Sequence, residues 1–144
     1  MMEFIFDTAR AVAGLAFSDR LRRDAPNARV IVPHVGGAIP VLVERWEAFA
    51  AMAPGVEPEQ VQRTLERVWF DLAGTPTPVQ ANLVVGRWGA DRLVYGSDYC
   101  FTPAPVVEAQ LRALDDVGID GVENWRQTTT SNAAVLVADR LLRR

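Results

Sequence analysis

The residues best suited to chemistry stand directly after short apolar runs. His34, the only histidine in the chain, follows the run 30–33, and Asp98 closely follows the run 93–96. Such runs are typical of buried strands in parallel sheets, and in α/β folds the carboxyl ends of these strands collect ligands and catalytic groups. We therefore expect His34 and Asp98 to face one site.

An imidazole and a carboxylate at one site suit proton transfer and metal binding. Histidine changes its charge near neutral pH, so His34 can act as a general acid or base or orient a water molecule. The Asp98 carboxylate is a hard oxygen donor that can bind a metal ion or accept a proton. A mononuclear metal site needs three or four side-chain ligands, however, and the sequence contains no second histidine. The predicted site is incomplete within this sequence.

Each of these residues also has a structural interpretation. His34 can be a strand-end histidine that hydrogen-bonds the backbone, and Asp98 can be a helix cap or a turn residue that holds the loop 97–102. Gly36 and Gly37 can present backbone amides to a carboxylate or phosphate. For the glycine pair we favour a tight strand-to-helix turn, which glycine permits sterically.

The composition favours one domain and excludes several classes of function. The chain has 144 residues, a mass of 15.9 kDa, 49% hydrophobic residues and a net charge of −3, which suits a single domain with its own core. Its basic residues are scattered, so we expect no nucleic-acid partner. No apolar stretch reaches the roughly 18 residues that a bilayer requires, and residues 1–8 lack the order of a signal peptide. We therefore expect no membrane partner and a cytoplasmic location.

A single cysteine, Cys100, excludes an intramolecular disulfide and any metal site built from several cysteines. We expect Cys100 to be a small packing residue.

Hydrophobic periodicity predicts strands that alternate with helices. Helical spacing covers residues 4–23, 39–50, 57–67, 77–88, 107–117 and 131–143, with a turn at 102–105, and the strand-like runs are 29–34, 69–72 and 93–97. Thr77-Pro78-Val79-Gln80 has the order of a capping box with proline at the first helical position, so a helix should begin there.

This alternation predicts an α/β fold with three parallel strands and right-handed crossovers. A (β/α)8 barrel needs eight strands and about 250 residues, so this chain can supply only the last three β/α units and the helix before them. Such a sheet has unpaired edges that invite pairing. We therefore expect a homo-oligomer or a complementing chain.

Five stretches of the chain resemble the amidohydrolase-related (amidohydrolase 2) family, in the order in which that family has them. The family includes metal-dependent decarboxylases of the aminocarboxymuconate-semialdehyde, γ-resorcylate and 6-methylsalicylate types. The most specific features are a histidine followed by two glycines and a strand that ends in Gly-Ser-Asp-Tyr. The matching stretches are 4–10, 31–40, 68–74, 91–99 and 131–134.

The resemblance implies roles for three strand-end residues. It implies that His34 approaches a metal-bound water or the substrate, that Asp98 binds a divalent metal such as zinc or manganese, and that Asp71 lines the same site. The substrate would be a small aromatic or enoic carboxylic acid. The His-x-His pair and the strand-five histidine of the family have no counterpart in this sequence.

These observations predict that residues 1–144 form part of one barrel domain. The predicted function is the carboxy-terminal portion of a metal-dependent amidohydrolase-superfamily decarboxylase or hydrolase, inactive alone. The alternative is a non-enzymatic remnant that acts as an oligomeric or partner-binding module. A third possibility is a small-molecule binding domain that uses the turn at Gly36 and Gly37.

Overall fold

The computed structural model describes residues 3–74 and 78–141, and it consists of two compact units. The first unit comprises Met1–Val32 and Gly36–Trp69, and the second comprises Pro33–Val35 and Phe70–Arg144. Strands alternate with helices along the chain, and the three strands β1 (Val30–Val32), β2 (Val68–Asp71) and β3 (Leu93–Val94) form one sheet in the order β1-β2-β3. The prediction of three strands that alternate with helices is confirmed.

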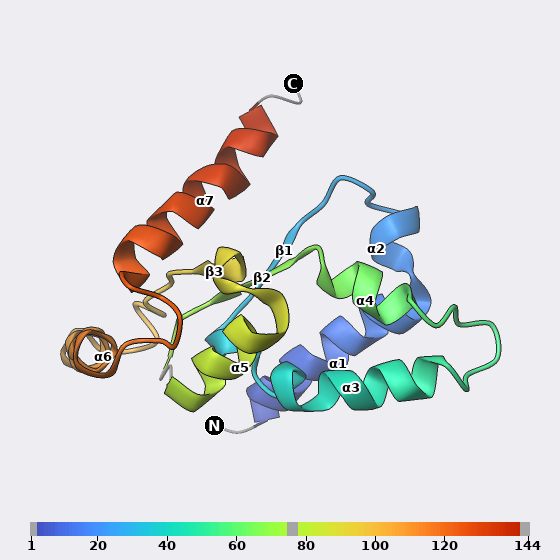
Figure 1. Ribbon diagram of the computed structural model, residues 1–144, viewed down its shortest axis with the longest axis horizontal. Coiled ribbons are helices and arrows are strands. Elements are labelled where there is room, and N and C mark those ends of the chain that lie inside the picture. Colours follow the sequence, from blue (N-terminus) through green and yellow to red (C-terminus); the bar gives the residue numbers. More distant parts are fainter. Residues whose placement is uncertain (1–2, 75–77, 142–144) are drawn as a thin grey trace. The chain divides into compact units, whose positions relative to one another are not determined.

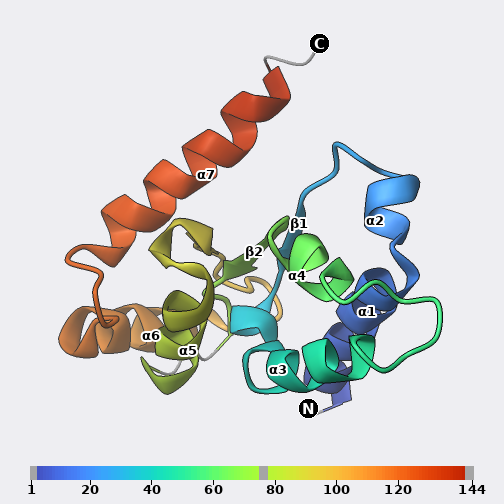
Figure 2. The same cartoon turned by 45° about the vertical axis from the view of Figure 1, so that its right-hand side comes forward.

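The first unit is mainly helical. The helices α1, α3 and α4 contact one another and lie side by side in both views (Figures 1 and 2). Their facing surfaces are apolar because residues at helical spacing, such as Val12 in α1 and Val43 in α3, are buried. The helices of this unit are α1 (Glu3–Ser18), α2 (Arg20–Arg23), α3 (Ile39–Ala50) and α4 (Gln60–Leu65).

The helix predicted over residues 4–23 is interrupted at Asp19, so the prediction of one continuous helix was wrong. Asp19 has left-handed backbone angles, φ 55° and ψ 18°, which an α-helix cannot contain. Its carboxylate accepts a hydrogen bond of 2.7 Å from Arg22 Nε, in the short helix α2 that follows. Aspartate tolerates this conformation better than most residues, and the chain changes direction there.

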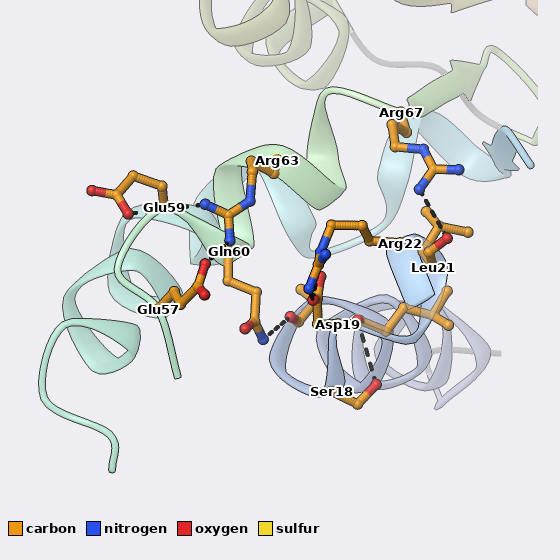
Figure 3. A network of polar contacts seen from close by, with 11 residues as sticks. Ser18, Asp19, Leu21, Arg22, Glu57, Glu59, Gln60, Arg63 and Arg67 are labelled. Carbon is orange, nitrogen blue, oxygen red and sulfur yellow. Dashed lines mark hydrogen bonds and ion pairs between the residues drawn. The ribbon is translucent and has the colours of Figure 1, made fainter. Parts of the chain in front are cut away.

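Side chains of the segment 60–67 hold the helices and loops of the first unit (Figure 3). Gln60 Nε2 donates a buried hydrogen bond of 2.7 Å to the carbonyl oxygen of Ala16. The Arg67 guanidinium donates to the carbonyl oxygens of Leu21, Ala25 and Ala28 at 2.9, 2.7 and 2.6 Å. Because a guanidinium has five N–H groups in a fixed plane, one arginine can fix the whole connection from α2 to β1.

The second unit contains the end of β2, all of β3 and three helices. β2 and β3 pair in parallel, with Phe70 beside Leu93 and Asp71 beside Val94. The ring of Phe70 packs on the ring of Trp88 at a centroid distance of 4.8 Å. The helices are α5 (Pro78–Trp88), α6 (Ala104–Val117) and α7 (Trp125–Leu141), with the 3₁₀ turn η2 (Ala90–Arg92) before β3. Figure 2 shows the loop that joins α6 to α7.

Asn132 joins α7 to the strand β3. Its Nδ2 donates hydrogen bonds to the carbonyl oxygens of Leu93, at 2.7 Å, and Ala90, at 2.8 Å. The carbonyl of Val94 instead accepts the N–H of Leu72, the residue directly after β2. Since successive residues of a strand point their carbonyls to opposite sides, Asn132 satisfies a carbonyl on the side of β3 away from β2.

Two strands are shorter than the sequence predicts. β1 ends at Val32 instead of residue 34, and β3 ends at Val94 instead of residue 97. At β1 the reason is that His34 has a left-handed φ of 56°, which an extended strand excludes. β3 ends at Val94 because Val94 pairs with Asp71, the last residue of β2.

The helix boundaries follow the sequence with three differences. α3 and α5 have the predicted extents within two residues, although Thr77 of the predicted capping box lies outside the described residues. α6 begins at Ala104, inside the predicted turn 102–105, because the first turn of a helix accommodates a proline such as Pro105. The helix predicted over 57–67 contracts to α4. The predicted last helix begins at Trp125 instead of residue 131, because Asn124 Oδ1 accepts the N–H of Gln127 at 3.0 Å and caps an earlier start.

Within residues 3–74 and 78–141, no helix combines the length and the apolar character needed to cross a membrane.

Candidate functional site

The candidate residues lie at or just after the carboxyl ends of the three strands, and all belong to the second unit. His34 comes two residues after β1 and begins a turn (η1, His34–Gly36), Asp71 is the last residue of β2, and Asp98 comes four residues after β3. All three side chains are neither fully buried nor fully exposed. They are therefore placed where a ligand in solution can reach them and where the protein can still fix their orientation.

Asp71 connects the three positions. Its Oδ1 accepts two backbone hydrogen bonds of 3.0 Å, one from the N–H of His34 and one from the N–H of Ala73. Burial raises the pKa of Asp71, and the negative charge of Asp98 raises it further, whereas the two N–H groups and His34 lower it. His34 and Asp98 are thus both within electrostatic reach of the Asp71 carboxylate.

The backbone of His34 is bonded on both sides. Its N–H donates to Asp71, and its carbonyl oxygen accepts a hydrogen bond of 3.2 Å from Gln80 Nε2 in α5. Its imidazole lies against the backbone of Gly74, because a Cβ added to that glycine would stand 2.5 Å from Nδ1. Gly74 has φ +74°, so the position requires glycine both for its conformation and for the space that the ring fills.

Asp98 stands in a turn of its own. Its Oδ2 accepts a hydrogen bond of 2.6 Å from Thr102 Oγ1, and its carbonyl oxygen accepts the N–H of Thr102 at 2.7 Å. The predicted turn-holding role of Asp98 therefore describes real contacts. Gly96, between β3 and this turn, lies against Asp71, since an added Cβ would be 3.1 Å from Asp71 Oδ2.

The glycine pair after His34 fits the structural interpretation. Gly37 has φ +56°, and a Cβ there would be only 2.8 Å from the carbonyl oxygen of Ile5. This close approach of α1 explains the glycine. Cys100, in contrast, is exposed, so its expected role as a packing residue was wrong: the loop after Asp98 turns it toward solvent.

Three residues of the site were missed by the sequence analysis, namely Gly74, Gln80 and Gly96. Gly74 and Gly96 each follow an apolar run, a place where a close backbone approach is common. Gln80 belongs to the predicted helix start at 77–80, and nothing local in the sequence indicates that its amide reaches His34. Only the resemblance assigns a role to Asp71, which lies near the end of a strand-like run instead of following one as His34 and Asp98 do.

A complete metal site does not form from the described residues. Among residues 3–74 and 78–141, no group of three or more His, Cys, Asp or Glu side chains is placed to hold a metal ion. A structural or catalytic mononuclear site needs at least three protein ligands. These side chains alone therefore do not fit a bound metal, and only single donors such as the Asp98 carboxylate are available.

The chain is similar in sequence to fungal decarboxylases. It is 26% identical to decarboxylase yanB of Aspergillus niger over 94% of its own length, and 26% identical to 6-methylsalicylic acid decarboxylase of Penicillium expansum over 98%. It spans only 38% and 44% of the lengths of these two relatives. No protein-family model matches the chain.

The fold is also that of part of an amidohydrolase barrel. A crystal structure described as amidohydrolase II superposes on this chain with a TM-score of 0.75 at 25% sequence identity. The superposition includes 94% of this chain and 43% of the amidohydrolase II chain. The crystal structure of 5-carboxyvanillate decarboxylase from Sphingomonas paucimobilis superposes with a TM-score of 0.67 at 17% sequence identity. This superposition includes 90% of this chain and 39% of the decarboxylase chain. Over nearly its whole length, the chain therefore resembles part of the amidohydrolase-related decarboxylases.

Proposed function

We propose that residues 1–144 form the last three β/α units of a metal-dependent amidohydrolase-superfamily decarboxylase. The observation that supports this most is the placement of His34, Asp71 and Asp98 at or just after the carboxyl ends of three strands of one sheet, with the N–H of His34 bonded to the Asp71 carboxylate. Strand ends of the same sheet edge are where barrel enzymes place their catalytic groups. The similarity to two decarboxylases over nearly the whole chain supports the reaction type.

The substrate class follows from the same relatives. One of them is named for 6-methylsalicylic acid, a small aromatic carboxylic acid. Loss of carbon dioxide from such an acid leaves a carbon that must take up a proton. His34 is the residue best suited to move that proton or to orient water, because imidazole is an effective general acid and base near neutral pH. Its backbone is held on both sides, which fixes the place from which the ring reaches the site.

Asp98 is proposed as one oxygen ligand of a divalent metal, zinc or manganese. The described residues supply no complete ligand set, so the other ligands must come from outside them. A complementing chain or a second copy of this chain would supply them. The chain alone should then be inactive.

A second candidate function is a non-enzymatic, partner-binding module. It is favoured by large apolar side chains that stand free in the loop after β3, since Tyr99 is 73% and Phe101 is 89% exposed. Aromatic side chains offer a large apolar area for burial and contribute strongly to interface energetics. A complementing half of a barrel would cover the same residues, so activity measurements must decide between the two functions.

The test is to combine this chain with the part of the Penicillium expansum decarboxylase that the similarity does not cover, and to measure release of carbon dioxide from 6-methylsalicylic acid. We expect turnover from the combination and none from the chain alone. His34→Ala should lower kcat at least about a hundredfold, the usual scale for loss of a general acid–base group. Asp98→Ala should abolish turnover, because it removes a proposed metal ligand. Asp116→Ala, on the exposed surface of α6, is the control and should leave kcat unchanged.

Circular dichroism must show that each variant is folded. Turnover by the purified chain alone, or a combination that tolerates both substitutions at the site, would contradict the proposal.

A further inference from the structure

We infer that Asp71, Gly74 and Gln80 form a seat that fixes His34, and that Asp71 is the positioning residue of this seat. Asp71 acts on the backbone of His34, so its contribution to chemistry is indirect. The catalytic meaning of the seat rests on the proposed function, but the seat itself is a property of this chain and can be measured without activity.

The first argument is the backbone conformation at His34. His34 and Val35 have φ values of 56° and 53°, and two consecutive non-glycine residues in the left-handed region are unfavourable by themselves. A β-branched residue such as Val35 is especially disfavoured there. Surrounding contacts must therefore hold this turn, and strained turns of this kind concentrate at functional sites.

The second argument is that side chains bind both polar groups of the His34 backbone. Asp71 Oδ1 accepts a hydrogen bond of 3.0 Å from the His34 N–H, and Gln80 Nε2 donates one of 3.2 Å to the His34 carbonyl oxygen. These bonds come from β2 and α5, so two separate elements fix one residue. A bond to a carboxylate is stronger than one to a neutral acceptor, which makes Asp71 the main support.

The third argument concerns the imidazole. The same Asp71 oxygen accepts the N–H of Ala73 and so shapes the turn that leads to Gly74. Gly74 then leaves the space that the ring of His34 occupies, because any Cβ would be 2.5 Å from Nδ1. One carboxylate thus sets both the backbone of His34 and the surface against which its ring packs. Keeping this carboxylate partly buried is costly, and the two N–H groups offset that cost.

The test uses nuclear magnetic resonance on the full ¹⁵N-labelled chain, in which the only imidazole signals belong to His34. Asp71→Ala should raise the exchange rate of the His34 amide about tenfold to a hundredfold, the effect expected for loss of a charged hydrogen bond, and shift the imidazole signals. Asp71→Asn keeps an oxygen acceptor without the charge and should restore part of the slow exchange. Unchanged exchange and imidazole signals in Asp71→Ala would overturn the inference.

Gly74→Ala and Gly121→Ala form a matched pair. Both glycines have nearly the same left-handed φ, +74° and +75°, but a Cβ at Gly121 meets nothing within 4 Å. Gly74→Ala should shift or broaden the imidazole signals, and Gly121→Ala should leave them as in the wild type. Equal effects of the two substitutions would overturn the inference.

Gln80→Leu covers the case in which Asp71→Ala fails to fold. It removes the bond to the His34 carbonyl without changing the carboxylate, and it should shift the imidazole signals while distant amides keep their exchange rates. Imidazole signals like those of the wild type would count against the seat.

Measurements of kcat and KM distinguish a failure of this inference from a failure of the proposed function. In the combined enzyme, Asp71→Ala should lower kcat while KM stays within about twofold, and Asp71→Asn should recover most of the loss, as expected for a group that positions a proton-transfer residue. If the combination is inactive but the resonance results hold, the proposed function fails and the seat stands. If turnover depends on His34 while Asp71→Ala leaves its amide and ring unchanged, the seat fails alone.

Discussion

Left-handed backbone conformations are concentrated at the candidate site of this chain. Four non-glycine residues among those described have positive φ, and three of them, His34, Val35 and Asp98, belong to the two turns of the candidate site. Such residues persist only where neighbouring groups hold them, and here Asp71, Gln80 and Thr102 do so. The strain is thus concentrated where the proposed chemistry needs fixed geometry.

Asp19, the fourth such residue, gives a prediction about pH. A hydrogen bond from Arg22 lowers the pKa of Asp19 in the folded chain, and the Coulombic attraction of the same side chain adds to it. A lowered folded pKa means that the unfolded chain binds the proton more readily. The resulting stability is therefore present above the ordinary aspartate pKa of about 3.9 and is lost as the pH falls through the folded value.

Asp19→Asn isolates this charge, because asparagine also tolerates the left-handed conformation. In urea denaturation, the wild type should have a higher free energy of unfolding than the variant at pH 7, and the difference should shrink as the pH falls below about 4. Asp116→Asn, on the exposed surface of α6, controls for the loss of one negative charge. A difference that is constant from pH 7 to pH 2.5 would rule out this ion pair as its cause.

At the level of elements, the contact between α7 and β3 depends on one amide. Asn132→Ala removes hydrogen bonds to the carbonyls of Leu93 and Ala90, and we expect it to lower the free energy of unfolding by about 1–3 kcal/mol. Ser131→Ala is the neighbouring control on the exposed side of the same helix and should change it by less than about 0.5 kcal/mol. Chemical denaturation measures both, and an equally small loss in the two variants would show that Asn132 contributes nothing.

Elements with a continuous apolar stripe could be predicted from the sequence. α3 was predicted correctly because Ile39, Val43 and Ala50 share one face and are buried in the structure. Elements whose ends depend on polar contacts were not. The break at Asp19 depends on its conformation and its bond to Arg22, and the early start of α7 depends on a cap from Asn124, which carries no apolar signal.

The candidate site shows the same division. His34 and Asp98 could be singled out because each follows a short apolar run, and this needs no tertiary information. Asp71 and Gln80 both bind the backbone of His34, although they are far from it in the sequence. Only the pairing of the strands and the placement of α5 bring these residues together. Sequence position thus indicated where chemistry could occur, while folding determines which groups hold it in place.

For the molecule as a whole, a sheet of three strands leaves edges that a barrel would close. Together with the exposed Tyr99 and Phe101, this predicts that the chain associates with itself when no complementing chain is present. Light scattering coupled to gel filtration at low micromolar concentration should give a mass above 15.9 kDa. A monomer of 15.9 kDa that unfolds cooperatively would contradict the partial-barrel account.

The most direct test of that account is the content of divalent metal, measured by elemental analysis after dialysis against buffer without chelator. Loaded with zinc or manganese, the chain alone should retain far less than one equivalent, because its described residues do not supply three ligands. The combination with the complementing part of the Penicillium expansum relative should retain close to one, and Asp98→Asn should lower that amount. Stoichiometric metal on the chain alone, or a combination unaffected by Asp98→Asn, would contradict the account.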